Sequence, residues 1–84
     1  MKLALYKYDT CGYCARVLRT IRSMGLEDRI ELRDVLRDPA RREELFEARG
    51  RGTVPVLRIE DDAGAVRWMG ESRDIVTWLE TTFG

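Results

Sequence analysis

Two cysteines three positions apart, Cys11 and Cys14, are the residues of this sequence best suited to covalent chemistry. They are its only cysteines, and they lie where a strand-like segment gives way to a helix-like one. Two thiols one helical turn apart can close a disulfide. A thiol at a helix N-terminus also lies among exposed N–H groups that favour its thiolate. Because the thiolate is the reactive form, the Cys11-Gly12-Tyr13-Cys14 segment predicts a redox-active pair.

Three other interpretations compete with a redox-active pair. A structural disulfide normally joins distant segments, whereas this one would close only a very small loop. A zinc site needs about four ligands, and the sequence contains no histidine and no third cysteine. Two buried and inert thiols are the remaining alternative, although Cys11 lies at a predicted turn and is expected to be at least partly exposed.

Size and charge limit the class of protein. The 84 residues are expected to form a single domain, 1–84, and a chain of this size buries about 60% of its unfolded surface. Its 15 basic and 15 acidic residues balance, which argues against a nucleic-acid partner. No apolar segment approaches the ~18 residues of a membrane span, and residues 1–6 are too short for a signal peptide. We therefore expect a cytoplasmic protein without a membrane partner, in which a cysteine pair is more often catalytic than structural.

The first half of the sequence predicts a strand, a helix and a second strand. Residues 3–8 carry few charges and are expected to form a central strand. The following helix spaces its apolar residues three or four positions apart and ends at Gly25, with Leu26 packing back against it. Residues 30–35 alternate apolar and charged side chains, which predicts a strand with one face toward water. The two strands are expected to be parallel, with a right-handed crossover.

A second helix is predicted to begin at Asp38-Pro39, because aspartate is a favourable cap and proline fits the first helical position. It is expected to end before Gly50. Its predicted buried residues are Ala40, Leu45, Phe46 and Ala48.

A hairpin and a third helix complete the predicted βαβαββα order. Strands over residues 56–59 and 65–69 are joined by an Asp-Asp-Ala-Gly turn. Ser72 is expected to cap the last helix. The residues of that helix expected to face the core are Ile75, Val76, Leu79 and Phe83.

Three segments, in this order, resemble the glutaredoxins along essentially the whole chain. They are Cys11-Gly12-Tyr13-Cys14 after the first strand, Thr53-Val54-Pro55 before the third, and Met-Gly-Glu-Ser-Arg-Asp-Ile over residues 69–75 at the start of the last helix. The resemblance implies an α/β, thioredoxin-like fold with a four-stranded mixed sheet flanked by three helices.

The resemblance implies a glutathione-dependent thiol–disulfide oxidoreductase, with glutathione as co-substrate and glutathionylated or disulfide-bonded proteins as substrates. Cys11 is then the nucleophile and Cys14 the more buried resolving thiol. In this family the proline that matches Pro55 is cis, and the backbone of Val54 pairs with glutathione as an added strand would. The implied glutathione-binding residues are Tyr13, Thr53, Val54, Pro55, Glu71 and Ser72.

The start of the last helix departs from the usual glutaredoxin pattern. Glutaredoxins typically have Gly-Gly, a variable residue and Asp-Asp there, and only Gly70 and Asp74 match. Glu71-Ser72 instead resembles the Glu-Ser pair with which the N-terminal domains of glutathione transferases hold the γ-glutamyl group. A carboxylate can bind the ammonium of this group, while a serine and a helix N-terminus can bind its carboxylate. The plain alternative is a helix cap beside a solvated charge.

A second departure precedes the cysteines. Many glutaredoxins carry a lysine three residues before the nucleophile, where it binds the glycine carboxylate of glutathione. This chain has Tyr8 there, and its neighbour Lys7 is expected to face the opposite side of the strand. Arg51 is a further candidate for that carboxylate.

The third departure is Gly12, where many glutaredoxins have proline. Related proteins with Cys-Gly-Tyr-Cys include members that hold a [2Fe–2S] cluster between two subunits, with glutathione as further ligand. An iron–sulfur carrier that uses Cys11 as metal ligand is therefore one alternative function. A redoxin that is reduced by thioredoxin reductase is another. We expect a monomer that dimerises only if a cluster is bound.

Overall fold

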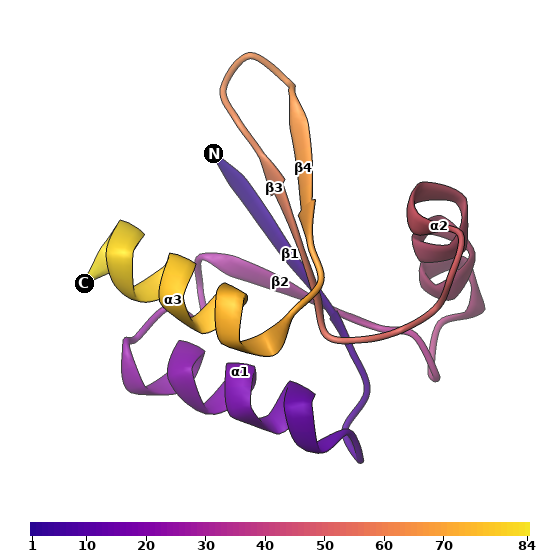
Figure 1. The fold of residues 1–84 in the computed structure, drawn as a ribbon, viewed down its shortest axis with the longest axis horizontal. Coiled ribbons are helices and arrows are strands. Elements are labelled where there is room, and N and C mark those ends of the chain that lie inside the picture. Colours follow the sequence, from indigo (N-terminus) through magenta and orange to yellow (C-terminus); the bar gives the residue numbers. More distant parts are fainter.

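The computed structural model describes all 84 residues, and its elements follow the predicted βαβαββα order (Figure 1). These elements are β1 (Lys2–Lys7), α1 (Gly12–Ser23), β2 (Ile30–Asp34), α2 (Pro39–Arg49), β3 (Val56–Glu60), β4 (Val66–Met69) and α3 (Ser72–Phe83). None of the helices is both long and apolar enough to cross a membrane.

The four strands form one mixed sheet in the order β2-β1-β3-β4. As predicted, β1 is central: it pairs with β2 in parallel and with β3 in antiparallel orientation. The register sets Lys7 opposite Asp34 and Tyr6 opposite Val56. The end of β1, the end of β2 and the start of β3 therefore lie at the same end of the sheet. This topology is that of the thioredoxin-like fold.

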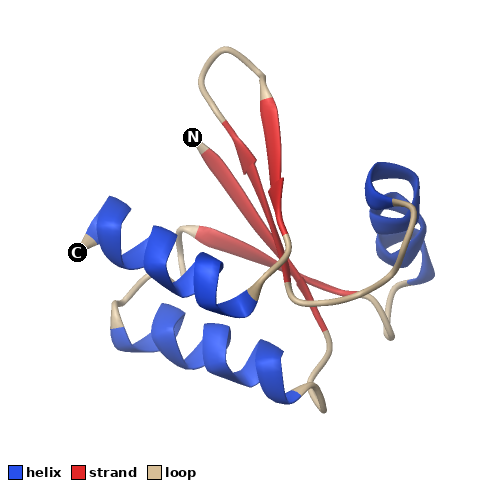
Figure 2. Cartoon of the chain, in the orientation of Figure 1, coloured by secondary structure: helices blue, strands red, loops and turns tan.

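The helices cover the two faces of the sheet unequally. α1 and α3 lie side by side on one face. α2 stands apart from them, near the end of the sheet at which β1 finishes (Figures 1 and 2). The larger core lies under α1 and α3 and consists of Leu3, Leu5, Val17, Ile21, Leu26, Ile30, Leu57, Ile59, Ile75 and Leu79. A second cluster consists of Tyr6, Cys11, Cys14, Val35, Leu45, Val54 and Val56. Both cysteines thus belong to the second cluster.

Local signals define the ends of α1 and α2 as predicted. Gly25 has a positive φ of 68°. The Leu26 N–H donates to the Ile21 carbonyl at 2.9 Å, which completes a Schellman motif. At the start of α2, the Asp38 side chain accepts the Ala40 N–H at 3.1 Å, and Pro39 takes the first helical position.

Three expectations about burial and capping are wrong. Of the predicted buried residues of α2 only Leu45 is buried; Ala40 and Ala48 are exposed and Phe46 is 42% exposed. This helix packs on the sheet through a narrow strip, so its flanks face water. Ser72 is not the cap of α3 but its first residue, since Glu71 precedes the helix without a side-chain capping hydrogen bond.

The third expectation concerns β2, whose apolar side chains were expected on the buried face. Leu32 is 49% exposed because β2 is an edge strand that the helices do not fully cover. On α3, Ile75 and Leu79 are buried as predicted, while Val76 and Phe83 are only partly buried.

We expect Leu45→Ala to lower the free energy of unfolding by about 2–4 kcal/mol, because it empties a fully buried position on the one buried contact of α2. Urea denaturation measures the effect. Glu43→Ala, on the exposed side of the same helix, is the control and should change stability by less than about 0.5 kcal/mol. Equal effects of the two substitutions would contradict this anchoring of α2.

Candidate functional site

Cys11 is the N-terminal cap of α1. Its backbone is extended, with φ −85° and ψ 119°, and its Sγ accepts the N–H of Cys14 at 3.2 Å. The Cys11 carbonyl accepts the N–H of Ala15 at 3.0 Å, which begins the helical hydrogen bonding. The sulfur therefore lies where a helix terminus favours negative charge. The strand–turn–helix context predicted for Cys11 is confirmed.

The two thiols have different surroundings although both are free. Cys14 is fully buried, and burial, followed by the hydrogen bond with Cys11, raises the pKa of its thiol to about 12. The backbone of Tyr8 and the charge of Lys7 act in the opposite direction on this pKa. Cys14 is the more buried thiol, as expected. The expectation that Cys11 is partly exposed at its turn is wrong: it is buried, with 8% of its surface exposed, because it packs in the second cluster.

The segment before β3 faces Cys11. The Val54–Pro55 peptide bond is cis, as the resemblance implied. The Val54 carbonyl oxygen lies 3.9 Å from Cys11 Sγ, near enough for a weak hydrogen bond from the thiol. Val54 and Pro55 are buried, and Thr53 is exposed. Tyr13 lies beside the thiol with 70% of its surface exposed. The structure thus brings together the cysteine pair and the segment before β3.

The start of α3 holds a second group of polar residues. Glu71 is exposed and Ser72 is buried. A cleft of about 550 Å³ runs beside them, and its lining includes Arg49, Trp68, Gly70, Glu71, Asp74 and Trp78. Cys11, Thr53 and Val54 do not line this cleft. The N-terminal ends of α1 and α3 nevertheless lie at the same end of the molecule (Figure 1).

Arg49 is the residue of this cleft that the sequence did not reveal. It is the last residue of α2, and its guanidinium reaches Gly70, where an added Cβ would come within 2.5 Å of Nη2. No ion pair within the chain involves Arg49, Glu71 or Asp74. With Arg67, which also lines the cleft and makes no ion pair, the cleft therefore holds two cations and two carboxylates that do not neutralise one another directly. No local pattern marks an arginine at the end of a helix as a cleft residue.

Lys7 does not face the surface. It is 9% exposed, and its Nζ lies 2.7 Å from Asp9 Oδ1 and 3.4 Å from Asp34 Oδ2. Many glutaredoxins carry a glutathione-binding lysine where this chain has Tyr8. The placement of Lys7 agrees with the expectation that it does not take over that role. Arg51 is exposed and is available at the loop before β3.

Gly12 is the first residue of α1, and neither its backbone nor its neighbours require glycine. Its φ is not positive, and a Cβ there would meet nothing within 4 Å. No group of three or more cysteine, aspartate or glutamate side chains could hold a metal ion within the chain. A [2Fe–2S] cluster would therefore need ligands from outside a single chain.

Comparison with known proteins places the domain. The model of the glutathione S-transferase N-terminal domain matches residues 10–82. The chain belongs to this family. The match agrees with the resemblance of Glu71-Ser72 to glutathione transferases. It does not specifically indicate the glutaredoxins, so that resemblance holds at the level of the thioredoxin-like fold.

Solved structures with this fold include several glutathione-dependent enzymes. Leishmania TDR1, a trimeric glutathione transferase, has 26% identity and a TM-score of 0.76, over 98% of this chain and 18% of that chain. The maleylacetoacetate isomerase from Anaeromyxobacter dehalogenans 2CP-1 has 32% identity and a TM-score of 0.70, over 98% and 36% of the two chains. An epsilon-class glutathione S-transferase from the housefly, Musca domestica, has 28% identity and a TM-score of 0.71, over 99% and 36%.

The chain is thus equivalent to only a part of these enzymes, between 18% and 36% of the length of each. One structure of the Anaeromyxobacter isomerase has GSH bound in its active site. The sequence matches no curated protein.

We expect iodoacetamide at about pH 8 to alkylate Cys11 in the folded protein and to leave Cys14 almost unmodified. Cys14 is fully buried, and with a pKa of about 12 it keeps its proton far above neutral pH. Peptide mass spectrometry measures the two rates, and both cysteines should react once the chain is unfolded in guanidinium. Faster alkylation of Cys14 than of Cys11 would contradict the assignment of Cys11 as the reactive thiol.

The raised pKa of the Cys14 thiol also predicts that the free energy of unfolding falls as the pH rises from 9.0 toward about 12, because the unfolded chain loses this proton first.

Proposed function

We propose that the domain is a glutathione-dependent thiol–disulfide oxidoreductase of the glutaredoxin type. The observation that carries the proposal is the hydrogen bond from the Cys14 N–H to Cys11 Sγ at the start of α1, combined with the complete burial of Cys14. One thiol is set up to hold negative charge, and the other is kept protonated beside it. This division suits a nucleophile and a resolving thiol.

The proposed reaction begins with a protein–glutathione mixed disulfide. The Cys11 thiolate attacks the glutathione sulfur, the S–S bond between glutathione and the substrate protein breaks, and the leaving protein thiolate takes up a proton. A second glutathione thiolate then attacks the glutathione sulfur bound to Cys11. This step forms oxidised glutathione and restores the Cys11 thiolate, so each turnover consumes one free glutathione and takes the other half of the oxidised glutathione from the substrate.

Protein disulfides would follow a second branch through Cys14. Cys11 first forms a mixed disulfide with the substrate. Cys14 then loses its proton and attacks the Cys11 sulfur, and the second substrate thiolate leaves. The resulting Cys11–Cys14 disulfide is reduced again by two glutathione molecules.

Charge complementarity supports glutathione as the ligand. Its γ-glutamyl end carries an ammonium and a carboxylate, and the cleft beside α3 offers Glu71 to the first and Arg49 to the second. The helix N-terminus at Ser72 favours the same carboxylate. The backbone of Val54 lies beside Cys11, where it would pair with the cysteinyl part of glutathione. The exposed Thr53 and Tyr13 would border this part, and Arg51 would meet the glycine carboxylate.

Family membership favours a second candidate, a glutathione transferase or isomerase activity. In that case the same groove would present the thiolate of glutathione to an electrophilic carbon, and Cys11 would not change its oxidation state. Conjugation of 1-chloro-2,4-dinitrobenzene that persists in Cys11→Ser would favour this candidate over the oxidoreductase.

We expect Cys11→Ser to abolish reduction of a glutathione mixed disulfide and Cys14→Ser to keep a substantial part of it, because Cys11 is the only thiol of the chain that forms a bond to glutathione in the first proposed reaction. The assay is run in parallel with glutathione reductase and with thioredoxin reductase as electron source. Glutathione reductase should sustain turnover. Equal loss in the two variants, with turnover only from thioredoxin reductase, would replace the proposal by a dithiol redoxin.

We expect Glu71→Gln and Arg49→Gln each to raise the KM for glutathione about five- to tenfold, as loss of one partly exposed charge-assisted contact does. Gly70→Ala should have a similar effect, because the added Cβ would displace the Arg49 guanidinium. Glu80→Gln, on the exposed side of α3, is the matched control. Unchanged KM values in all the variants would remove this cleft from the glutathione site.

In the [2Fe–2S] alternative, Cys11 from each of two chains and two glutathione thiolates would supply the four sulfur ligands. Anaerobic reconstitution with iron, sulfide and glutathione, followed by visible absorption and size-exclusion chromatography, separates it from the oxidoreductase. A colourless monomer would exclude the cluster.

A further inference from the structure

Residues 51–54, between α2 and β3, carry much of the proposed glutathione site but make almost no hydrogen bonds of their own. They belong to no helix or strand. No hydrogen bond within the chain involves residues 51–53. The one hydrogen bond of Val54 is weak, because its carbonyl oxygen lies 3.9 Å from Cys11 Sγ. Packing must therefore hold residues 51–54 in place.

Phe46, in the last turn of α2, lies against these residues. A Cβ added to Gly52 would come within 2.8 Å of Phe46 Cε2, 3.4 Å of Cδ2 and 3.6 Å of Cζ. The edge of the phenyl ring therefore occupies the space in which any other residue at position 52 would carry its side chain. The φ of Gly52 is not positive, so the close approach of the ring, and not the backbone conformation, is what requires glycine here.

The ring is also in contact with its own helix. The guanidinium carbon of Arg42, one turn earlier on α2, lies 5.1 Å from the centroid of the Phe46 ring. Phe46 is nevertheless 42% exposed, so its burial contributes less to stability than that of a core phenylalanine would. The contact with Gly52 is the more specific consequence of its position.

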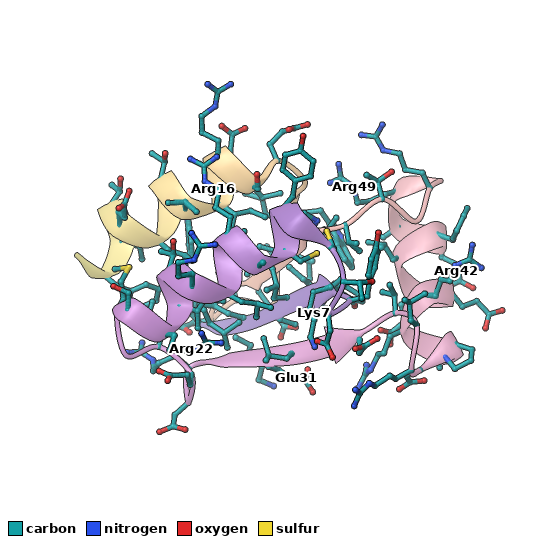
Figure 3. The ribbon with its side chains drawn as sticks, turned by 90° about the horizontal axis from the view of Figure 1, so that it is seen from below. Lys7, Arg16, Arg22, Glu31, Arg42 and Arg49 are labelled. Carbon is teal, nitrogen blue, oxygen red and sulfur yellow. The ribbon has the colours of Figure 1, made fainter.

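The last turn of α2 thus reaches the proposed site at two points. Phe46 meets Gly52, and Arg49, three residues later, reaches Gly70. Between them Gly50 ends the helix, with a φ of 73° and its N–H bonded to the Phe46 carbonyl at 2.7 Å. Figure 3 shows Arg49 at the end of α2, where the chain leaves the helix and runs back toward the N-terminal end of α1.

We propose that Phe46 is a positioning residue for glutathione: its ring, laid against Gly52, fixes residues 51–54 in front of Cys11 before the ligand arrives. The inference rests on the proposed function and deepens it, because the fixed residues are those whose backbone would pair with glutathione. In this role Phe46 acts through Gly52 and not on the reacting sulfur atoms.

The benefit of the contact is preorganisation. Residues without hydrogen bonds move freely unless packing restrains them, and ordering them on binding opposes affinity by the conformational entropy that they lose. Removal of the ring would free Gly52 and its neighbours, while Val54 and Pro55 would stay buried. Phe46→Ala should therefore weaken glutathione binding about three- to tenfold, at the low end of the entropy of fixing one or two residues.

The chemistry at Cys11 should not depend on the ring. Its Sγ accepts the N–H of Cys14 at 3.2 Å, a contact made within the first turn of α1. Phe46→Ala should thus raise the KM for a glutathionylated peptide and leave kcat within about twofold of wild type, as loss of uniform binding does. A merely structural role of Phe46 would not produce this division.

The test combines NMR and kinetics on the reduced full chain. ¹⁵N relaxation measures the order of residues 51–53 without ligand, titration with reduced glutathione gives Kd, and reduction of a glutathionylated peptide gives KM and kcat. The variants are Phe46→Ala, Gly52→Ala and the double variant. Leu32→Ala is the control, because Leu32 is an apolar residue of similar exposure, 49%, on β2.

The double variant separates the ring contact from a general loosening of α2. In the wild-type background, the Cβ of Gly52→Ala meets the ring and should raise Kd about two- to fivefold, as overpacking does. In the Phe46→Ala background no ring is left to meet, so the same substitution should have no further effect. Leu32→Ala should match wild type in every measurement.

The expected result is a loss of order at residues 51–53 and a Kd raised about three- to tenfold in Phe46→Ala. Unchanged order or unchanged Kd in Phe46→Ala would overturn the inference and leave the proposed function standing. Equal effects of Gly52→Ala with and without the ring would do the same.

Failure of the proposed function has a different signature. A wild-type protein that neither binds reduced glutathione nor turns over with glutathione reductase would overturn the proposed function, and the inference with it.

Discussion

The pairing of β1 on both of its sides is the constraint on which the rest of the structure depends. Its parallel register with β2 sets Lys7 against Asp34, and its antiparallel register with β3 sets Tyr6 against Val56. Because β1 leads directly into the turn that carries Cys11, the thiol emerges where β3 begins and the Val54 carbonyl is near. A shift of β1 by one residue would exchange its two faces and separate the thiol, the carbonyl and the buried cation.

The same strand also makes two chemically identical residues unequal. Cys11 caps α1 and accepts a backbone hydrogen bond, whereas Cys14, one turn further, lies in the core, where burial raises the pKa of its thiol to about 12. The difference comes from the position of α1 over the sheet and needs no imidazole, which the chain lacks. Backbone hydrogen bonding and burial thus supply the main electrostatics of the cysteine pair.

Signals confined to a few neighbouring residues predicted their structure well. The alternation in β1, the apolar spacing of α1, the Gly25-Leu26 helix end and the Asp38-Pro39 start all act through local hydrogen bonds or one helix face. The features that the sequence did not reveal depend on distances between elements. Helical spacing predicts that Phe46 is buried on the apolar face of α2. It does not show that α2 contacts the sheet only through a narrow strip, which leaves Phe46 exposed.

Two features of the site illustrate the same limit. Arg49 and Gly70 lie on different elements, and only their close approach gives either a role in the cleft. Ser72 has the side chain of a cap, yet the chain turns so that the helix begins with it. In both cases the residue type is compatible with several roles, and the packing of α2 and α3 selects one.

The reach of Arg49 across to Gly70 connects the least firmly packed helix with the cleft beside α3. Because α2 has a single buried side chain, Leu45, its attachment to the sheet is the weakest of the three helices. An anion that engages the Arg49 guanidinium would also fasten α2, and thermodynamic reciprocity requires that firmer docking of α2 strengthen the hold on that anion by the same free energy. Binding of an anion in the cleft and docking of α2 on the sheet would therefore be thermodynamically coupled.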